Sequence, residues 1–132
     1  MNEARRGAGQ TAYQVVVSEG DKPIWDSQTL MHNPMMDEKG RVWFTARIRP
    51  SANPDFCRAG SNHPSAKAFP LTTSGRQLSY FDPASQKFTL IDTCFSTHHL
   101  NFAHDANDTL WLSSGIGGAG AVGWVNTKMY DE

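Results

Sequence analysis

The chain of 132 residues is long enough for one domain with a modest core, and its composition, 39% hydrophobic and 19% charged, is that of a globular protein. Its 12 Lys and Arg nearly balance its 13 Asp and Glu, and the net charge of −1 excludes a general nucleic-acid binder, which needs a basic surplus. No apolar stretch approaches the roughly 18 residues of a membrane-spanning helix, so we expect no membrane span.

Short runs of aromatic and β-branched residues follow one another along the chain, with turn residues between them. In chain order they are YQVVVS (13–18), RVWFTARI (41–48), QLSYFD (77–82), KFTLIDT (87–93) and TLWLSS (109–114). Runs of this length bounded by Gly, Asp, Asn or Pro are typical of β-strands, and helical periodicity is nearly absent. We therefore predict an all-β chain that follows a disordered or irregular N-terminus at residues 1–11.

Two stretches repeat the same pattern of an Asp-led turn followed by a strand with Trp at a fixed place. HNPMMDEKGRVWFT, at residues 32–45, aligns with LNFAHDANDTLWLS, at residues 100–113. Asn and Asp match in this alignment, and Trp43 meets Trp111. We expect both tryptophans to pack in the core.

A long segment at 49–75 is rich in Pro, Ser, Ala and Asn and has no strand signal. Without it the repeat shortens to about 44 residues, the period of a four-stranded propeller blade. We therefore predict about two and a half β-propeller blades, each a four-stranded antiparallel sheet, from a larger propeller. Residues 12–28 end one blade, 29–93 form a complete blade with the inserted loop, and 98–130 start the next. The alternative is a small β-sandwich or meander.

Antiparallel alternation of the strands assigns each loop to one of two ends of the blades. One end receives the segments 28–32, 49–75, 94–99 and 114–121, and the other receives the plain turns DEKG, DPASQK and DAND. The unusual residues all fall at the first end. Loops held at one end of a rigid sheet scaffold commonly carry binding and catalytic groups.

The adjacent pair His98 and His99 is the strongest candidate at that end, beside the central channel. Imidazole can ligate a divalent metal or act as a general base near neutral pH, so both are candidate catalytic residues. Because neighbouring strand residues point to opposite sides, we expect at most one ring to face the channel and choose His99 as the metal ligand. The alternative is that both are exposed loop histidines.

Four further residues are candidates for substrate binding. His32 and Asn33 stand at the corresponding entrance of the preceding blade. Arg47 and Arg49 share one face of a strand, where they can hold a carboxylate or phosphate. The alternative is that the two arginines lie at an exposed strand end and bind nothing.

Cys57 and Cys94 are the two cysteines, and they lack the CxxC spacing of a zinc knuckle or a thioredoxin-like pair. They form one disulfide in an oxidising compartment, or they are two free thiols. If they are bridged, we expect an extracytoplasmic or periplasmic protein.

Three stretches, GRVWFTARI (40–48), GRQLSYFDPASQKFTLID (75–92) and HHLNFAHDANDTLWLSS (98–114), resemble the blades of streptogramin-lyase-like (virginiamycin B lyase-like) β-propellers. The resemblance covers residues 29–114. It implies a central channel that holds a divalent cation, Mg²⁺, with a histidine and an acid performing lyase chemistry. The catalytic motif of that family, two histidines flanking a glutamate, has no counterpart here, so no catalytic residue is carried over from it.

These observations together predict a propeller segment that binds a small molecule or a divalent metal at a loop-lined channel, with lyase or hydrolase activity. Its expected partners are that small molecule and the remaining blades of the propeller. The alternative is a non-catalytic propeller scaffold that presents its loops to a protein or a glycan. A bound metal with His98 or His99 as ligand favours the enzyme, and a metal-free aromatic face favours the scaffold.

Overall fold

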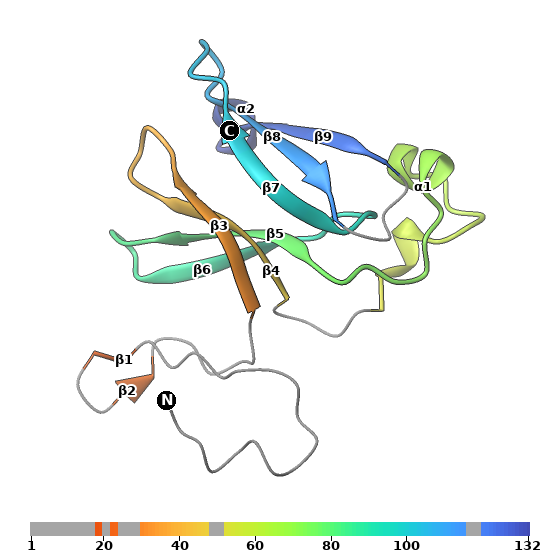
Figure 1. Ribbon diagram of the computed structural model, residues 1–132, viewed down its shortest axis with the longest axis horizontal. Helices are drawn as coiled ribbons and strands as arrows, with labels where there is room; N and C mark the ends of the chain where they lie inside the picture. Colours follow the sequence, from red (N-terminus) through yellow and green to blue (C-terminus); the bar gives the residue numbers. More distant parts are fainter. Residues whose placement is uncertain (1–17, 20–21, 24–29, 48–51, 116–119) are drawn as a thin grey trace.

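A computed structural model describes residues 18–19, 22–23, 30–47, 52–115 and 120–132 (Figure 1). The described residues form mainly antiparallel strands with short helices, which confirms the all-β prediction. Segment 1–11 and most of the predicted partial blade at 12–28 lie outside the described residues. Within that blade, β1 (Ser18–Glu19) and β2 (Lys22–Pro23) pair antiparallel.

The first main sheet has four strands that are neighbours in space in the same order as in the chain. They are β3 (Leu30–Met36), β4 (Val42–Arg47), β5 (Gln77–Asp82) and β6 (Lys87–Ile91), all antiparallel. Three of the predicted runs lie on β4, β5 and β6. Turn residues at both ends of each run determined these bounds.

The second sheet has three antiparallel strands, again in chain order: β7 (Thr97–Phe102), β8 (Thr109–Ser114) and β9 (Val122–Asn126). The short helix α2 (Thr127–Tyr130) follows β9, and the Asn126 side chain caps it by accepting from the backbone amide of Met129. Both β3 and β4 lie against β7, so the two sheets pack on each other with their first strands adjacent (Figure 1).

The core lies between the two sheets. Trp43 and Leu78 of the first sheet meet a layer of the second sheet made by Leu100, Phe102, Leu110 and Leu112. Successive strand residues point to opposite faces of a sheet, so Leu100 and Phe102 share one face of β7, and Leu110 and Leu112 share one face of β8. Each such side chain stabilises the fold by about 1.5–3 kcal/mol through burial.

The two tryptophans differ in their surroundings. Trp43 is fully buried, which confirms its prediction, whereas Trp111 is 43% exposed and its prediction as core was wrong. Trp111 stands between Leu110 and Leu112 on β8 and therefore points to the opposite face of the sheet. Neither of the two main sheets covers that face.

The turns at the start of β4 and β8 are built in the same way. Asp37 Oδ1 accepts from the amides two and four residues later, at 3.0 and 2.8 Å. Asp105 Oδ1 does the same at 3.1 and 3.0 Å. Asp37 also binds the indole nitrogen of Trp43 at 2.7 Å and the guanidinium of Arg41 at 2.6 Å. The aligned aspartates thus fold equivalent turns.

The segment 49–75 contains no strand in its described part, residues 52–75. It forms the 3₁₀ helix η2 (Asp55–Cys57) and the helix α1 (Pro64–Ala68). Pro64 is the first helical residue, and the imidazole of His63 caps the helix by accepting from Ser65 N at 3.3 Å. No helix in the described part of the chain is long and apolar enough to cross a membrane.

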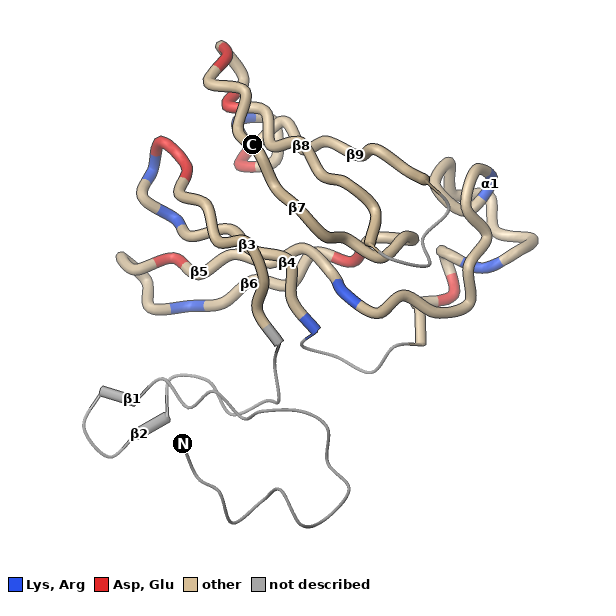
Figure 2. The backbone as a smooth tube through the Cα atoms, viewed as in Figure 1, with Lys and Arg blue, Asp and Glu red and all other residues tan. Residues whose placement is uncertain are grey.

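Two contacts confirm the predicted distribution of loops for the segments they join. A Cys57–Cys94 disulfide joins segment 49–75 to the link before β7. At the other end, Glu38 N donates to Asp108 Oδ2 at 3.1 Å, which joins the DEKG turn to the DAND turn. Figure 2 shows acidic residues at these two turns and basic residues where β4 ends and β5 begins.

Candidate functional site

Three histidines on the first strands of the two sheets lie close together. His32 lies on β3, and His98 and His99 lie on β7. The ring centroids are 4.6 Å apart for His32 and His98, 5.2 Å for His32 and His99, and 4.0 Å for His98 and His99. One ring nitrogen from each lies within 4.8 Å of the other two. We call this group the histidine cluster.

A β-bulge explains why the neighbours His98 and His99 share one side. The register of β7 with β8 shifts between Thr97 and Leu100, so β7 carries one extra residue there. Regular alternation would send the two rings to opposite sides, but a bulge breaks this alternation. The expectation that at most one of them faces inward therefore differs from the arrangement seen, in which both rings join His32.

Hydrogen bonds between the two sheets and within each of them fix the backbone of the cluster. Thr45 Oγ1 donates to the carbonyl oxygens of His98, at 2.7 Å, and of His32, at 3.3 Å. The amide of His99 donates to Ser113 Oγ at 3.1 Å. Thr45 is fully buried, so its hydroxyl fastens both strands that carry the histidines.

The surroundings of His32 and His98 favour the neutral form of these two imidazoles. Burial, with the positive charge of Arg76 and the neighbouring His99, lowers the pKa of His32. Burial, with both neighbouring imidazoles and Arg76, lowers the pKa of His98. The Nε2 atom of His32 is buried without a hydrogen-bond partner among the described residues. Neutral imidazole with a free nitrogen is the form that ligates metal.

The donor set distinguishes among metals. Three imidazoles suit Zn²⁺, Cu²⁺, Ni²⁺ or Fe²⁺, whereas Mg²⁺ prefers oxygen ligands. No carboxylate belongs to the cluster within the described residues. The residues present therefore do not fit the Mg²⁺ that the resemblance implies. At a Zn–N distance of about 2.0 Å, tetrahedral ligand atoms lie about 3.3 Å apart, so binding would draw the three rings closer together.

The four residues expected to bind substrate have different positions. His32 joins the cluster. Asn33 has a positive φ of 51° at a bulge of β3, and its Oδ1 accepts from the amide of Leu100, so it links the sheets. Arg47 is exposed, and its Nε donates to the carbonyl of Gly75 at 3.4 Å. Arg49 lies outside the described residues.

A pocket of about 300 Å³ lies next to the cluster, between the end of β4, the start of β5 and the start of β7. Arg47, Arg76 and His98 contribute to its lining. Arg76 was not among the site residues predicted from the sequence. Its position directly before a strand at the end of segment 49–75 could have placed it at the same end as Arg47.

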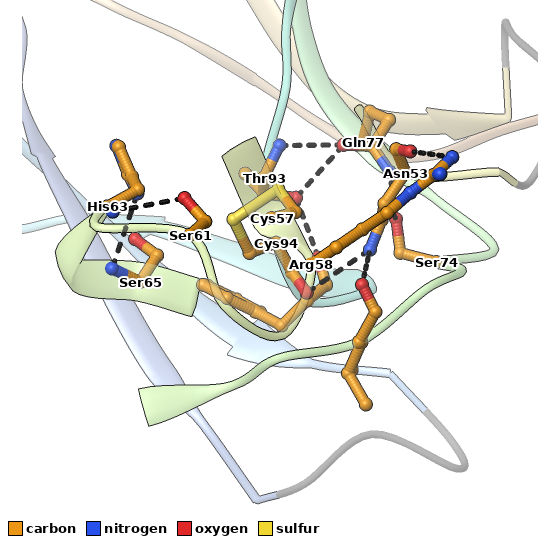
Figure 3. The surroundings of a disulfide bond; sticks show 12 residues. Asn53, Cys57, Arg58, Ser61, His63, Ser65, Ser74, Gln77, Thr93 and Cys94 are labelled. Carbon is orange, nitrogen blue, oxygen red and sulfur yellow. Dashed lines mark hydrogen bonds between the residues drawn. A yellow bond between two sulfur atoms is a disulfide. The ribbon is translucent and has the colours of Figure 1, made fainter. Parts of the chain in front are cut away.

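The Cys57–Cys94 disulfide anchors segment 49–75 beside this end of the sheets (Figure 3). Both cysteines are buried. Next to them, the buried Asn53 donates to the carbonyl of Cys94 at 3.4 Å and accepts from Ser74 Oγ at 2.8 Å. Gln77 Oε1 accepts from the amide of Thr93 at 2.7 Å. Of the two alternatives that the sequence left open, the bridge is present, and polar contacts around it hold the link into β7.

Comparisons of the chain with protein-family models, with curated proteins and with solved structures gave no match.

Proposed function

We propose that the two main sheets are neighbouring blades of a β-propeller of the streptogramin-lyase-like type, and that the histidine cluster binds a divalent transition metal at one end of its channel. The observation that carries this proposal is the convergence of His32, His98 and His99 from two sheets, with ring nitrogens within 4.8 Å. A buried, unpartnered ring nitrogen on His32 supports it.

The order of the strands supports the propeller. In each sheet the strands follow one another outward, and the chain then returns from the outermost strand β6 to β7, which lies beside β3. The two sheets also carry cross-strand aromatic pairs at corresponding places, Trp43 with Tyr80 and Trp111 with Trp124. The second sheet packs on the pair of Trp43 and Tyr80. In a propeller, a further blade would pack on the pair of Trp111 and Trp124 in the same way.

The exposure of the second aromatic pair supports the remaining blades as partners. Trp111 is 43% exposed and Trp124 is 65% exposed, and Val122 beside them is 68% exposed. A contiguous apolar face of this kind is typical of an interaction surface.

The metal would supply Lewis acidity, or a bound water that ionises near neutral pH, which is the chemistry of many hydrolases and lyases. His32, His98 and His99 would hold it and leave a coordination position open, because catalytic zinc sites use three protein ligands. Around it, Thr45 fixes the backbone of two ligands and thereby keeps their rings in place. We propose lyase or hydrolase activity on a small molecule bound beside this centre.

The disulfide supports an extracytoplasmic or periplasmic location, because disulfides persist in oxidising compartments.

Calorimetric titration of the untagged protein with Zn²⁺ tests the metal site. We expect one Zn²⁺ per chain, and more than about tenfold weaker binding for His98→Asn and for His99→Asn, because each loses one of three protein ligands. His104→Asn is the matched control, since His104 is exposed and has a positive φ of 54° that asparagine tolerates. Equal binding by all three variants would contradict the proposal.

The exposed aromatic face favours a second candidate function, a non-catalytic scaffold that binds a protein or a glycan. Trp111 and Trp124 lie 6.0 Å apart between ring centroids, an arrangement suited to stacking on another apolar surface. A scaffold would bind its partner equally well with or without the histidines. Zn²⁺ binding that depends on His98 and His99 therefore favours the enzyme, and the absence of such binding favours the scaffold.

A further inference from the structure

The pocket beside the histidine cluster has a positive lining. Arg47 ends β4, Arg76 directly precedes β5, and both side chains border the pocket together with His98. Within the part of the chain that the structure describes, no Asp or Glu belongs to this lining. Among the described residues, neither arginine forms an ion pair with a carboxylate. Two arginines thus line one small space, and neither has a carboxylate partner in the described part of the chain.

Hydrogen bonds between residues at or next to the ends of β5, β7 and β8 hold the walls of this pocket. Ser96 Oγ accepts from the amide of Arg76 at 3.2 Å, and the carbonyl of Ser96 accepts from the amide of Gly115 at 2.6 Å. The amide of Thr97 donates to the carbonyl of Arg76 at 3.2 Å, and its hydroxyl donates to Gln77 O at 3.0 Å. The backbone around Arg76 is therefore fixed before any ligand arrives, which lowers the entropic cost of binding.

The pocket and the cluster share His98. Arg76 lines the same pocket as His98, so its positive charge lies close to the cluster. That charge opposes a metal cation at the cluster. An anion on the two arginines would offset it, so each ligand would favour the other.

We propose that this pocket binds the oxyanion group of a small acidic molecule, a carboxylate or a phosphate, through Arg47 and Arg76, and that the bound anion raises the affinity of the histidine cluster for its metal. The guanidinium fork matches both anions, because it can donate two parallel hydrogen bonds. The second half of this proposal rests on the proposed metal site, and the first half does not.

An NMR titration of the metal-free protein tests the pocket. Acetate and inorganic phosphate are the two probes, and backbone amide and arginine Nε signals are followed. We expect saturable shifts at Arg76, Ser96 and Gly115 with at least one probe, and the stronger probe identifies the class of ligand. Arg47→Met and Arg76→Met should each weaken binding about tenfold, because each removes a charge-assisted pair.

Lys67→Met is the matched control, since it removes one positive charge from an exposed position on α1. Thermal unfolding of each variant verifies that it is folded. Arg47→Lys and Arg76→Lys keep the charge without the fork, and we expect them to bind more weakly than wild type. Shifts that do not saturate, or arginine variants that behave like Lys67→Met, would mean an adventitious ion only and would overturn the proposal.

A Zn²⁺ titration with and without acetate tests the coupling. We expect acetate to tighten Zn²⁺ binding several-fold, and this gain should disappear in Arg76→Met. Unchanged Zn²⁺ affinity would refute the coupling. Acetate binding by the metal-free protein and Zn²⁺ binding without acetate are separate measurements, so failure of the pocket and failure of the metal site are distinguishable.

Discussion

Reduction of the Cys57–Cys94 disulfide is predicted to lower the free energy of unfolding by about 4 kcal/mol. The bridge joins residues 37 positions apart and so closes a loop of about that length in the unfolded chain. The loop-entropy relation gives a loss of roughly 13 cal/mol/K for such a loop, or about 4 kcal/mol at 25 °C. Both cysteines are buried, and the thiols released by reduction remain small apolar groups in the same space.

Urea unfolding followed by tryptophan fluorescence measures this loss, with and without a reductant. With a slope of about 2 kcal/mol/M, the midpoint should fall by about 2 M on reduction. Cys57→Ala/Cys94→Ala should show the reduced stability under both conditions, which controls for other effects of the reductant. A loss below about 1 kcal/mol would refute the reasoning, because the loop would then not be constrained by the bridge.

Three further predictions concern the sheets and their turns. Thr45→Val removes the hydroxyl that holds the carbonyl of His98, and should cost about 1–3 kcal/mol in urea unfolding and weaken Zn²⁺ binding; unchanged values in both assays would contradict the role given to Thr45. Gly123→Ala places a Cβ 2.6 Å from the ring of Phe95, and should destabilise by about 1–3 kcal/mol in the same assay, whereas a neutral effect would show that the ring moves freely. Asp105 accepts hydrogen bonds within its turn, and these bonds, first the one from a backbone amide and then the one from a hydroxyl, lower the pKa of its carboxyl from 3.8. The stabilisation that these bonds give the folded protein is therefore complete above that pH and is lost as the pH falls below it. Asp105→Asn should therefore destabilise more at about pH 6 than at about pH 3, and an equal effect at both would oppose this assignment.

The strands could be predicted because local signals agree with the fold. The run at 77–82, for example, begins and ends where β5 does, since Gly75 precedes it and Asp82 starts a turn. The aspartates at 37 and 105 were correctly identified as turn residues, because their carboxylates bind the amides of their own turns.

The histidine cluster could be predicted only in part. The loop distribution brought His32, His98 and His99 to one end, but the rule of alternation separated the neighbours. The bulge between Thr97 and Leu100 is a register shift between two strands, and the sequence of β7 alone carries no signal for it. Pairing with β8 determines it.

Burial of Trp111 could not be judged from its own strand. Its position matches that of Trp43, but exposure depends on whether another sheet lies on that face. The second sheet covers Trp43, and neither main sheet covers Trp111. Equivalent positions in a repeat therefore differ in burial where their neighbours differ.

The visible absorption of the Co²⁺-loaded protein shows whether the three histidines together hold a metal, because Co²⁺ replaces Zn²⁺ in sites of nitrogen ligands and its spectrum reports the geometry of the site. We expect one Co²⁺ per chain with the intense bands of a four-coordinate site, which His98→Asn and His99→Asn should abolish and His104→Asn should retain. A weak spectrum typical of Co²⁺ in water, or bands that survive in both cluster variants, would contradict it.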